Sequence, residues 1–168
     1  AILIKSYMKA IDETITLTSE EERVLHDYLF SVEIWGLYEL SFFSSCSPLL
    51  SVQLLTKYTR EMLRKSDFLQ GVGKNRNMMH TLLLNAFMAC IEVDDFTNAL
   101  YFKKQIEKNF FEENETYFRI VYLWAEGLLD SKQGRVEDGQ RKMEDAVRIF
   151  EMIGCSKSAD YYRSAIEC

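Results

Sequence analysis

Proline and glycine are scarce in this sequence, which has one proline, Pro48, and seven glycines among 168 residues. All-β sandwiches and barrels need frequent Gly- and Pro-rich turns, so this scarcity argues against them. A hydrophobic content of 48% argues against disorder. No run of eighteen apolar residues occurs, which excludes a transmembrane helix, and no basic segment accompanies the first apolar residues, which excludes a signal peptide. We expect one cytoplasmic domain over residues 1–168, belonging to a longer protein because the chain starts at Ala1 and not at methionine.

Motifs of catalysis and metal binding are also lacking. The four cysteines show no CxxC spacing, and His26 and His80 each stand alone on a predicted helix. Nucleophile-elbow, zinc-protease, Walker and dinucleotide-binding motifs do not occur. The segment Gly71-Val72-Gly73-Lys74 lacks the preceding strand that a phosphate-binding loop requires. The sequence therefore predicts no enzyme, no metal site and no cofactor, and it predicts free thiols in a reducing compartment.

The net charge of −6 argues against nucleic-acid binding by this segment itself. The charge is unevenly distributed, because residues 47–80 carry six Lys or Arg against two acidic residues. Such a basic segment is either a solvated helix face or an electropositive lining for an anionic ligand group. The sequence leaves both interpretations open.

Helical periodicity runs through the whole sequence, and no stretch alternates with a period of two. Thr18 and Glu21 form one of two overlapping capping boxes, which predict a helix start there. A second start is predicted at Ser47-Pro48, with Ser47 as the cap and a helix running to about Lys65. About nine helices are expected, many of them in pairs joined by short connections.

A degenerate repeat of 40 residues relates the later helices. Shifting the sequence by 40 places Asp94 over Gly134 and Ala99 over Gly139. Small residues on the second helix of a pair let two helices approach closely, and Gly139 and Ala146 suit this role. The sequence therefore predicts an all-α fold, a right-handed superhelix of antiparallel helix pairs that resembles tetratricopeptide repeats.

Asn85 lies inside the apolar run 82–87, where asparagine is a poor helix residue. Its amide is either satisfied within the core or pairs with the backbone of a bound peptide, to which it can both donate and accept. Arg76 and Asn77 precede it on the same predicted helix. The seven Met and eleven Phe residues likewise either fill the core or line an adaptable apolar groove.

Three segments resemble a known family. They are Trp35-Gly36-Leu37-Tyr38-Glu39-Leu40-Ser41-Phe42, Leu84-Asn85-Ala86, and the glycine-spaced segment from Gly134 to Gly154. Together they are similar to the C-terminal domain of Rgg/GadR/MutR-type transcriptional regulators, and the resemblance covers the chain from about residue 20 to its end. It implies helical repeats that dimerise and, in several members, bind short hydrophobic peptides on a concave face. DNA would be bound only through an N-terminal helix-turn-helix domain that this sequence lacks.

From this resemblance we expect a peptide-sensing and dimerisation domain and not an enzyme. The expected partners are a short hydrophobic peptide and a second copy of the chain, with no membrane. Polar and basic residues of the inner helices would contact the peptide: Arg76, Asn77 and Asn85, with Tyr38 and Tyr122 as wall residues. Arg76 would pair with a carboxylate and Asn85 with the peptide backbone. The alternative is a constitutive protein–protein assembly module that holds a fixed partner and responds to no peptide.

Overall fold

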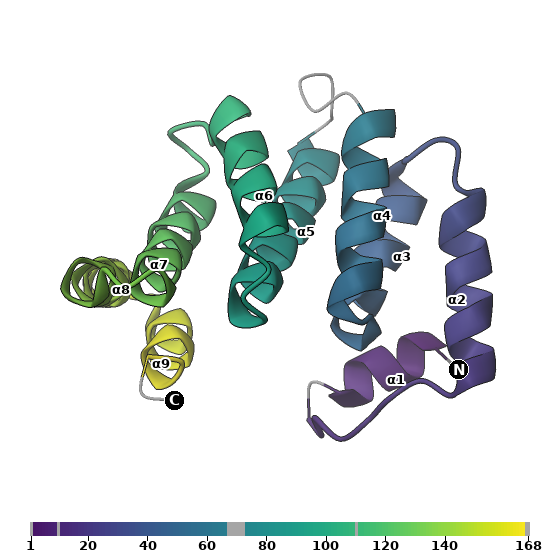
Figure 1. Ribbon diagram of the computed structural model, residues 1–168, viewed down its shortest axis with the longest axis horizontal. Helices are drawn as coiled ribbons and strands as arrows, with labels where there is room; N and C mark the ends of the chain where they lie inside the picture. Colours follow the sequence, from purple (N-terminus) through teal and green to yellow (C-terminus); the bar gives the residue numbers. More distant parts are fainter. Residues whose placement is uncertain (1, 10, 67–72, 110, 167–168) are drawn as a thin grey trace. The chain divides into compact units, whose positions relative to one another are not determined.

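The computed structural model describes residues 2–9, 11–66, 73–109 and 111–166, and these residues form helices without any strand (Figure 1). The elements in chain order are α1 (Ile2–Lys9), α2 (Ser19–Ser31), α3 (Leu37–Cys46), the 3₁₀ turn η1 (Ser47–Leu49), α4 (Val52–Lys65), α5 (Gly73–Glu92), α6 (Phe96–Lys108), α7 (Thr116–Lys132), α8 (Val136–Met152) and α9 (Ser156–Ser164). The all-α prediction is confirmed. None of the described helices combines the length and the apolarity needed to cross a membrane.

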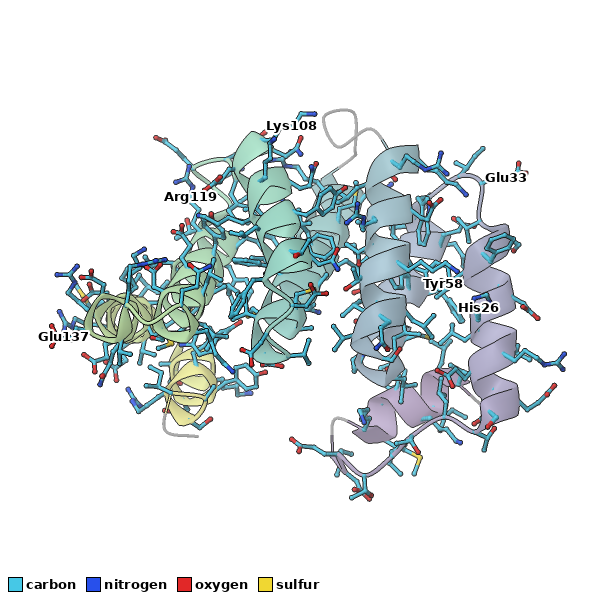
Figure 2. All side chains as sticks on the ribbon, in the orientation of Figure 1. His26, Glu33, Tyr58, Lys108, Arg119 and Glu137 are labelled. Atoms are coloured by element: carbon cyan, nitrogen blue, oxygen red, sulfur yellow. The ribbon has the colours of Figure 1, made fainter. Side chains whose placement is uncertain are left out.

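The chain divides into two compact units, Ala1–Ala86 and Phe87–Cys168, with the boundary inside α5. Each unit has its own core. In the first unit the core consists of side chains with almost no exposed surface: Leu25, Leu29, Leu40, Phe43, Tyr58 and Met62. The Tyr58 hydroxyl donates to the backbone carbonyl of His26 over 3.0 Å, which joins α4 to α2 (Figure 2).

The start of α2 confirms the predicted capping box. The Thr18 side chain accepts from the backbone N–H of Glu21, and the Glu21 carboxylate accepts from the backbone N–H of Thr18 over 2.9 Å. The same carboxylate lies 2.5 Å from the Nζ atom of Lys5 on α1. Glu21 therefore both starts α2 and holds α1 against it.

The predicted helix start at Ser47-Pro48 is wrong. These residues form the 3₁₀ turn η1, and α4 begins only at Val52, where the Ser51 side chain accepts from the backbone N–H of Leu54 over 3.4 Å. Pro48 is the second residue of η1, and proline in the first turn suits a 3₁₀ turn as well as an α-helix, because neither needs its missing N–H there. The predicted end at Lys65 is confirmed.

In the second unit, α7 and α8 form a hairpin in which two glycines meet. A Cβ atom added to Gly127 would lie 2.6 Å from the carbonyl oxygen of Gly139, and one added to Gly139 would lie 2.6 Å from the backbone nitrogen of Ser131. Real Cβ atoms do not come so close to backbone, so both positions need glycine. The predicted packing role of Gly139 is confirmed, and Gly127 is its partner.

Three connections of the second unit have the same shape. In each, a backbone N–H bonds to the carbonyl five residues earlier: Asp95 to Cys90 and Arg135 to Asp130, both over 2.9 Å, and Cys155 to Phe150 over 2.8 Å. The residue before each donor has a positive φ: 58° at Asp94, 90° at Gly134 and 79° at Gly154. This is the Schellman pattern of helix ends. The 40-residue offset that relates Asp94 to Gly134 thus corresponds to equivalent turns.

Candidate functional site

Helix α5 carries three of the five residues expected to contact a ligand. Asn85 is half-buried between the buried side chains of Leu84 and Ala86, and Asn77 is exposed near the helix start. Eight residues correspond to roughly 80° around an α-helix and nine to roughly 180°. Asn77 and Asn85 therefore share a side of α5, whereas the half-buried Arg76 lies on the side opposite Asn85.

The side that Asn77 and Asn85 share carries exposed and half-buried residues of the first unit, which we call the α5 strip: Asn77, Thr81 and Asn85. The Thr81 hydroxyl donates to the backbone carbonyl of Asn77 over 3.0 Å, so this hydroxyl is satisfied within the helix. Most residues on the other sides of α5 between 79 and 91 are buried. The strip thus offers two side-chain amides, each of which can both donate and accept hydrogen bonds.

The two predicted wall residues have different surroundings. Tyr38 stands in the first turn of α3 with 69% of its surface exposed. Tyr122 on α7 is only 5% exposed, and its ring lies 6.2 Å from that of Phe87 and 6.1 Å from that of Phe111. The structure therefore gives Tyr122 a role in packing, and Tyr38 is the tyrosine of the two that a ligand can reach.

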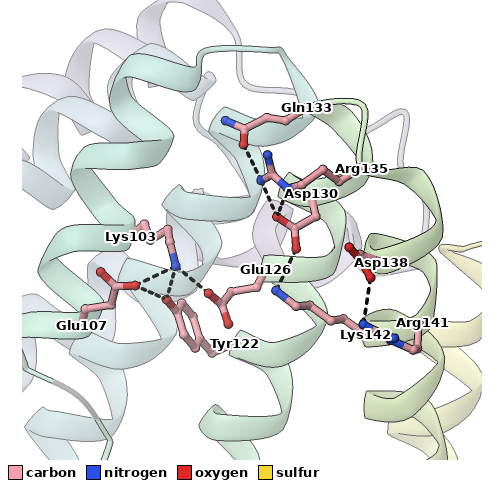
Figure 3. A network of polar contacts seen from close by, with 10 residues as sticks. All are labelled: Lys103, Glu107, Tyr122, Glu126, Asp130, Gln133, Arg135, Asp138, Arg141 and Lys142. Carbon is pink, nitrogen blue, oxygen red and sulfur yellow. Dashed lines mark hydrogen bonds and ion pairs between the residues drawn. The ribbon is translucent and has the colours of Figure 1, made fainter.

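A polar network around Lys103 joins α6 to α7 (Figure 3). The Lys103 Nζ atom donates to Glu126 over 2.5 Å, to Glu107 over 2.7 Å and to the Tyr122 hydroxyl over 3.0 Å. Burial alone lowers the pKa of Lys103, but the hydrogen bonds to Glu107, Glu126 and Tyr122 outweigh it and raise the pKa above its ordinary value. Burial likewise raises the pKa of the Tyr122 hydroxyl. Lys103 therefore stays charged and Tyr122 stays neutral, as these hydrogen bonds between α6 and α7 require.

Asp130 forms a second polar link, which joins α7 to α8. Its carboxylate accepts from Lys142 over 2.7 Å and from Arg135 over 2.5 Å (Figure 3). Partial burial raises the pKa of this carboxyl, but the two hydrogen bonds outweigh it and leave the pKa below the ordinary value. The Asp130 carboxylate is therefore held in its charged form by two neighbouring cations and is not placed as a general acid.

Several basic residues of the 47–80 segment are engaged by their own unit. Lys57 lies over the rings of Phe30 and Tyr58, with Nζ 5.6 and 5.2 Å from the two centroids. Lys65 donates to the backbone carbonyl of Val32 over 2.6 Å, and Arg64 pairs with Glu61 over 2.8 Å. The solvated-face interpretation fits these three better than an anion-binding lining does. The predicted loop at Gly71–Gly73 lies largely outside the described residues.

In the described part of the chain, no group of side chains is assembled for metal binding or for thiol chemistry. It contains no cluster of three or more His, Cys, Asp or Glu side chains that could hold an ion. Cys46 and Cys90 are buried free thiols, and burial raises the pKa of the Cys46 thiol to about 11. Cys155 is partly exposed, and Cys168 lies outside the described residues.

Two surface pockets have linings that include none of the five expected contact residues. One, of about 390 Å³, is lined by Ile2, Leu3, Glu20, Glu21, Val24 and Phe42. The other, of about 370 Å³, is lined by Leu128, Ser131, Lys132, Val136, Gln140, Met143, Ala165 and Ile166. Sequence reasoning missed both, because each joins residues from segments that no local pattern connects. The only earlier signal for the first pocket is the apolar pattern at the start of the chain.

The comparisons with known proteins agree on one family. Residues 1–164 match the profile of the HTH-type transcriptional regulator Rgg, C-terminal domain. The fold is similar to the X-ray structure of the SHP pheromone receptor Rgg2 from Streptococcus dysgalactiae, with a TM-score of 0.88 and 29% identity over 99% of this chain and 64% of that chain. A cysteine-to-serine variant of that receptor gives a TM-score of 0.87 at 29% identity, over 99% and 61% of the two chains.

A solved structure from Listeria monocytogenes EGD-e is similar in fold alone, with a TM-score of 0.77 and 21% identity over 90% of this chain and 52% of that chain. In all three comparisons the chain spans less than two thirds of the length of the protein that it matches.

Proposed function

The chain belongs to the family of Rgg C-terminal domains, and on that premise we propose that it is a regulatory domain that senses a short hydrophobic peptide. In this proposal the domain acts in the cytoplasm as part of a homodimeric regulator, and DNA is contacted by a separate helix-turn-helix domain. Binding energy that differs between two arrangements of the dimer would then change the affinity for DNA. The pheromone receptor among its structural relatives supports a peptide as the ligand.

The observation that carries the proposal is the α5 strip. Asn77 and Asn85 lie on one side of the helix, about 12 Å apart along its axis, since each residue adds about 1.5 Å. An extended peptide covers that distance with about four residues. The two amides would pair with the peptide backbone, to which an amide can both donate and accept. Because Arg76 lies on the other side of α5, the proposal rests on the two asparagines, with Tyr38 as a further contact.

The test is isothermal titration of the chain with a set of short hydrophobic peptides, repeated with Asn85→Ala. We expect at least one peptide to bind, and the substitution to weaken its binding about tenfold, because one or two hydrogen bonds of about 1 kcal/mol each are lost. Asn114→Ala is the matched control, since Asn114 is an exposed asparagine in the connection before α7.

Two results would contradict the proposal in different ways. If no peptide binds, the sensing function fails and the constitutive assembly module becomes the better account. If a peptide binds equally well to the wild type and to Asn85→Ala, the function survives, but the α5 strip is not its site.

A further inference from the structure

Thr81 stands midway between the two asparagines of the α5 strip. Asn77, Thr81 and Asn85 follow one another at intervals of four residues on α5, and all three belong to the first unit. Four residues add about 6 Å along a helix axis and about 40° around it. The strip is therefore a regular row of three side chains, in which the half-buried Thr81 separates two amides.

The hydroxyl of Thr81 is turned toward its own helix, where it donates to the backbone carbonyl of Asn77 over 3.0 Å. A threonine hydroxyl that bonds to the carbonyl four residues earlier fixes the χ1 angle, and with it the direction of the γ-methyl group. In the part of the chain that the structure describes, the side-chain amides of Asn77 and Asn85 make no hydrogen bond. A ligand on the strip thus meets two available amides and, between them, a methyl group beside a hydroxyl whose proton is already used.

The spacing of this row matches that of an extended peptide. Side chains on one face of an extended chain recur at every second residue, about 6.6 Å apart, which is close to the 6 Å or so between neighbours of the strip. In the proposed function, Asn77 and Asn85 pair with the backbone of such a peptide. The peptide residue that lies midway between the two paired residues then turns its side chain toward Thr81.

We infer that the γ-methyl group of Thr81 selects an apolar side chain at this middle position of the bound peptide. A charged side chain there would lose water against the methyl group and gain no new partner, which is unfavourable. An aliphatic side chain would bury its own surface together with that of the methyl group. The inference rests on the peptide-sensing function proposed above and adds to it one ligand position that is recognised by its side chain.

The test uses two substitutions that separate the methyl group from the hydroxyl. Thr81→Ser removes the methyl group and keeps the hydroxyl, whereas Thr81→Val keeps the methyl group and removes the hydroxyl. The probe is the tightest-binding member of a set of eight-residue peptides of Leu, Ile and Val, titrated calorimetrically into the 168-residue chain. We expect Thr81→Ser to weaken binding about fourfold, as the loss of one buried methyl group predicts, and Thr81→Val to stay within about twofold of the wild type.

A charge exchange identifies the peptide position that Thr81 faces. Each residue of the probe is changed to Asp in turn, and each changed peptide is titrated into the wild type and into Thr81→Lys. We expect Thr81→Lys to strengthen the binding of the peptide with Asp at the middle position about tenfold, because the two opposite charges then meet at a partly desolvated contact. The other Asp peptides should gain less.

Thr116→Ser is the matched control. Thr116 stands at the start of α7 in the other unit, and its hydroxyl also donates to a backbone carbonyl, that of Glu113, over 3.2 Å. We expect this variant to bind the probe like the wild type. The helical circular dichroism signal of every variant should equal that of the wild type, so that a change in affinity reports on the contact and not on the fold.

Several results would overturn the inference and leave peptide sensing intact. They are a Thr81→Ser variant that binds the probe as tightly as the wild type, a Thr81→Val variant that binds as weakly as Thr81→Ser, a Thr81→Lys variant that favours no Asp peptide, and a Thr116→Ser variant that loses as much affinity as Thr81→Ser. If no peptide of the set binds to the wild type, the sensing function fails and the inference fails with it.

Discussion

Gly127 and Gly139 determine how closely α7 and α8 approach, because a methyl group at either position would collide with backbone atoms. In an open helix, replacing glycine by alanine stabilises by about 0.5–1 kcal/mol. Here the collision opposes that gain, and overpacking of this kind costs about 1–3 kcal/mol. We therefore expect Gly139→Ala to lower the free energy of unfolding by about 1–2 kcal/mol, measured as a lower urea midpoint. Gln140→Ala, at the exposed neighbouring position, is the control, and a raised midpoint for Gly139→Ala would contradict the close approach.

The equivalent turns at Asp94 and Gly134 allow a paired experiment on backbone strain. Both residues have a positive φ, 58° and 90°, and a Cβ atom added to Gly134 would meet nothing within 4 Å. A left-handed conformation costs about 1 kcal/mol or more for a residue with a Cβ atom. Gly134→Ala should therefore destabilise the fold by about 1 kcal/mol, while Asp94→Gly should be neutral or slightly stabilising. Thermal unfolding of both variants checks this, and equal shifts of the same sign would refute it.

At the scale of the element, the attachment of α1 depends on the ionisation of Glu21. Hydrogen bonds from Lys5 and from the backbone N–H of Thr18 lower the pKa of this carboxyl from 4.5 to about 2. The charged form therefore favours the folded state, and its contribution is complete above pH 4.5 and is lost as the pH falls toward 2. We expect amide exchange in α1 to accelerate over that interval.

Glu21→Gln keeps the size of the side chain and removes its charge, so its α1 should exchange faster at pH 7 and show a weaker dependence on acid. Glu20→Gln is the control, because Glu20 pairs with Arg23 on the exposed surface of α2. Identical acid profiles for the wild type and Glu21→Gln would show that another group anchors α1.

Across the whole molecule, the sequence predicted those features that depend on residues close together in the chain. The Thr18–Glu21 box was predictable because both its hydrogen bonds join residues three apart. The small residues at Ala99 and Gly139 were predictable because the 40-residue repeat puts a small residue at the same place in successive helix pairs. The helix start predicted at Ser47-Pro48 was wrong because the same two residues suit a 3₁₀ turn as well as an α-helix. No local feature separates the two.

The candidate site was less predictable, since it depends on the rotation of each helix. Arg76 and Asn85 lie on one helix as expected, but a spacing of nine residues puts them on opposite sides. Tyr122 is only 5% exposed, and its hydroxyl accepts a hydrogen bond from Lys103, which is nineteen residues away in the sequence. Whether the predicted contact residues bind a peptide stays a prediction, which the titration of Asn85→Ala decides.

The exposed apolar residues of α1 and of the turn after it also bear on how a cell handles the protein. Ile4, Tyr7 and Ile11, on α1 and in the turn after it, expose 64%, 71% and 92% of their surface. Chaperones and proteases recognise such segments, and they act on whatever fraction of a protein exposes them. Any contact that covers these side chains would hide this signal, so the quantity of the protein that a cell retains would depend on that contact as well as on synthesis.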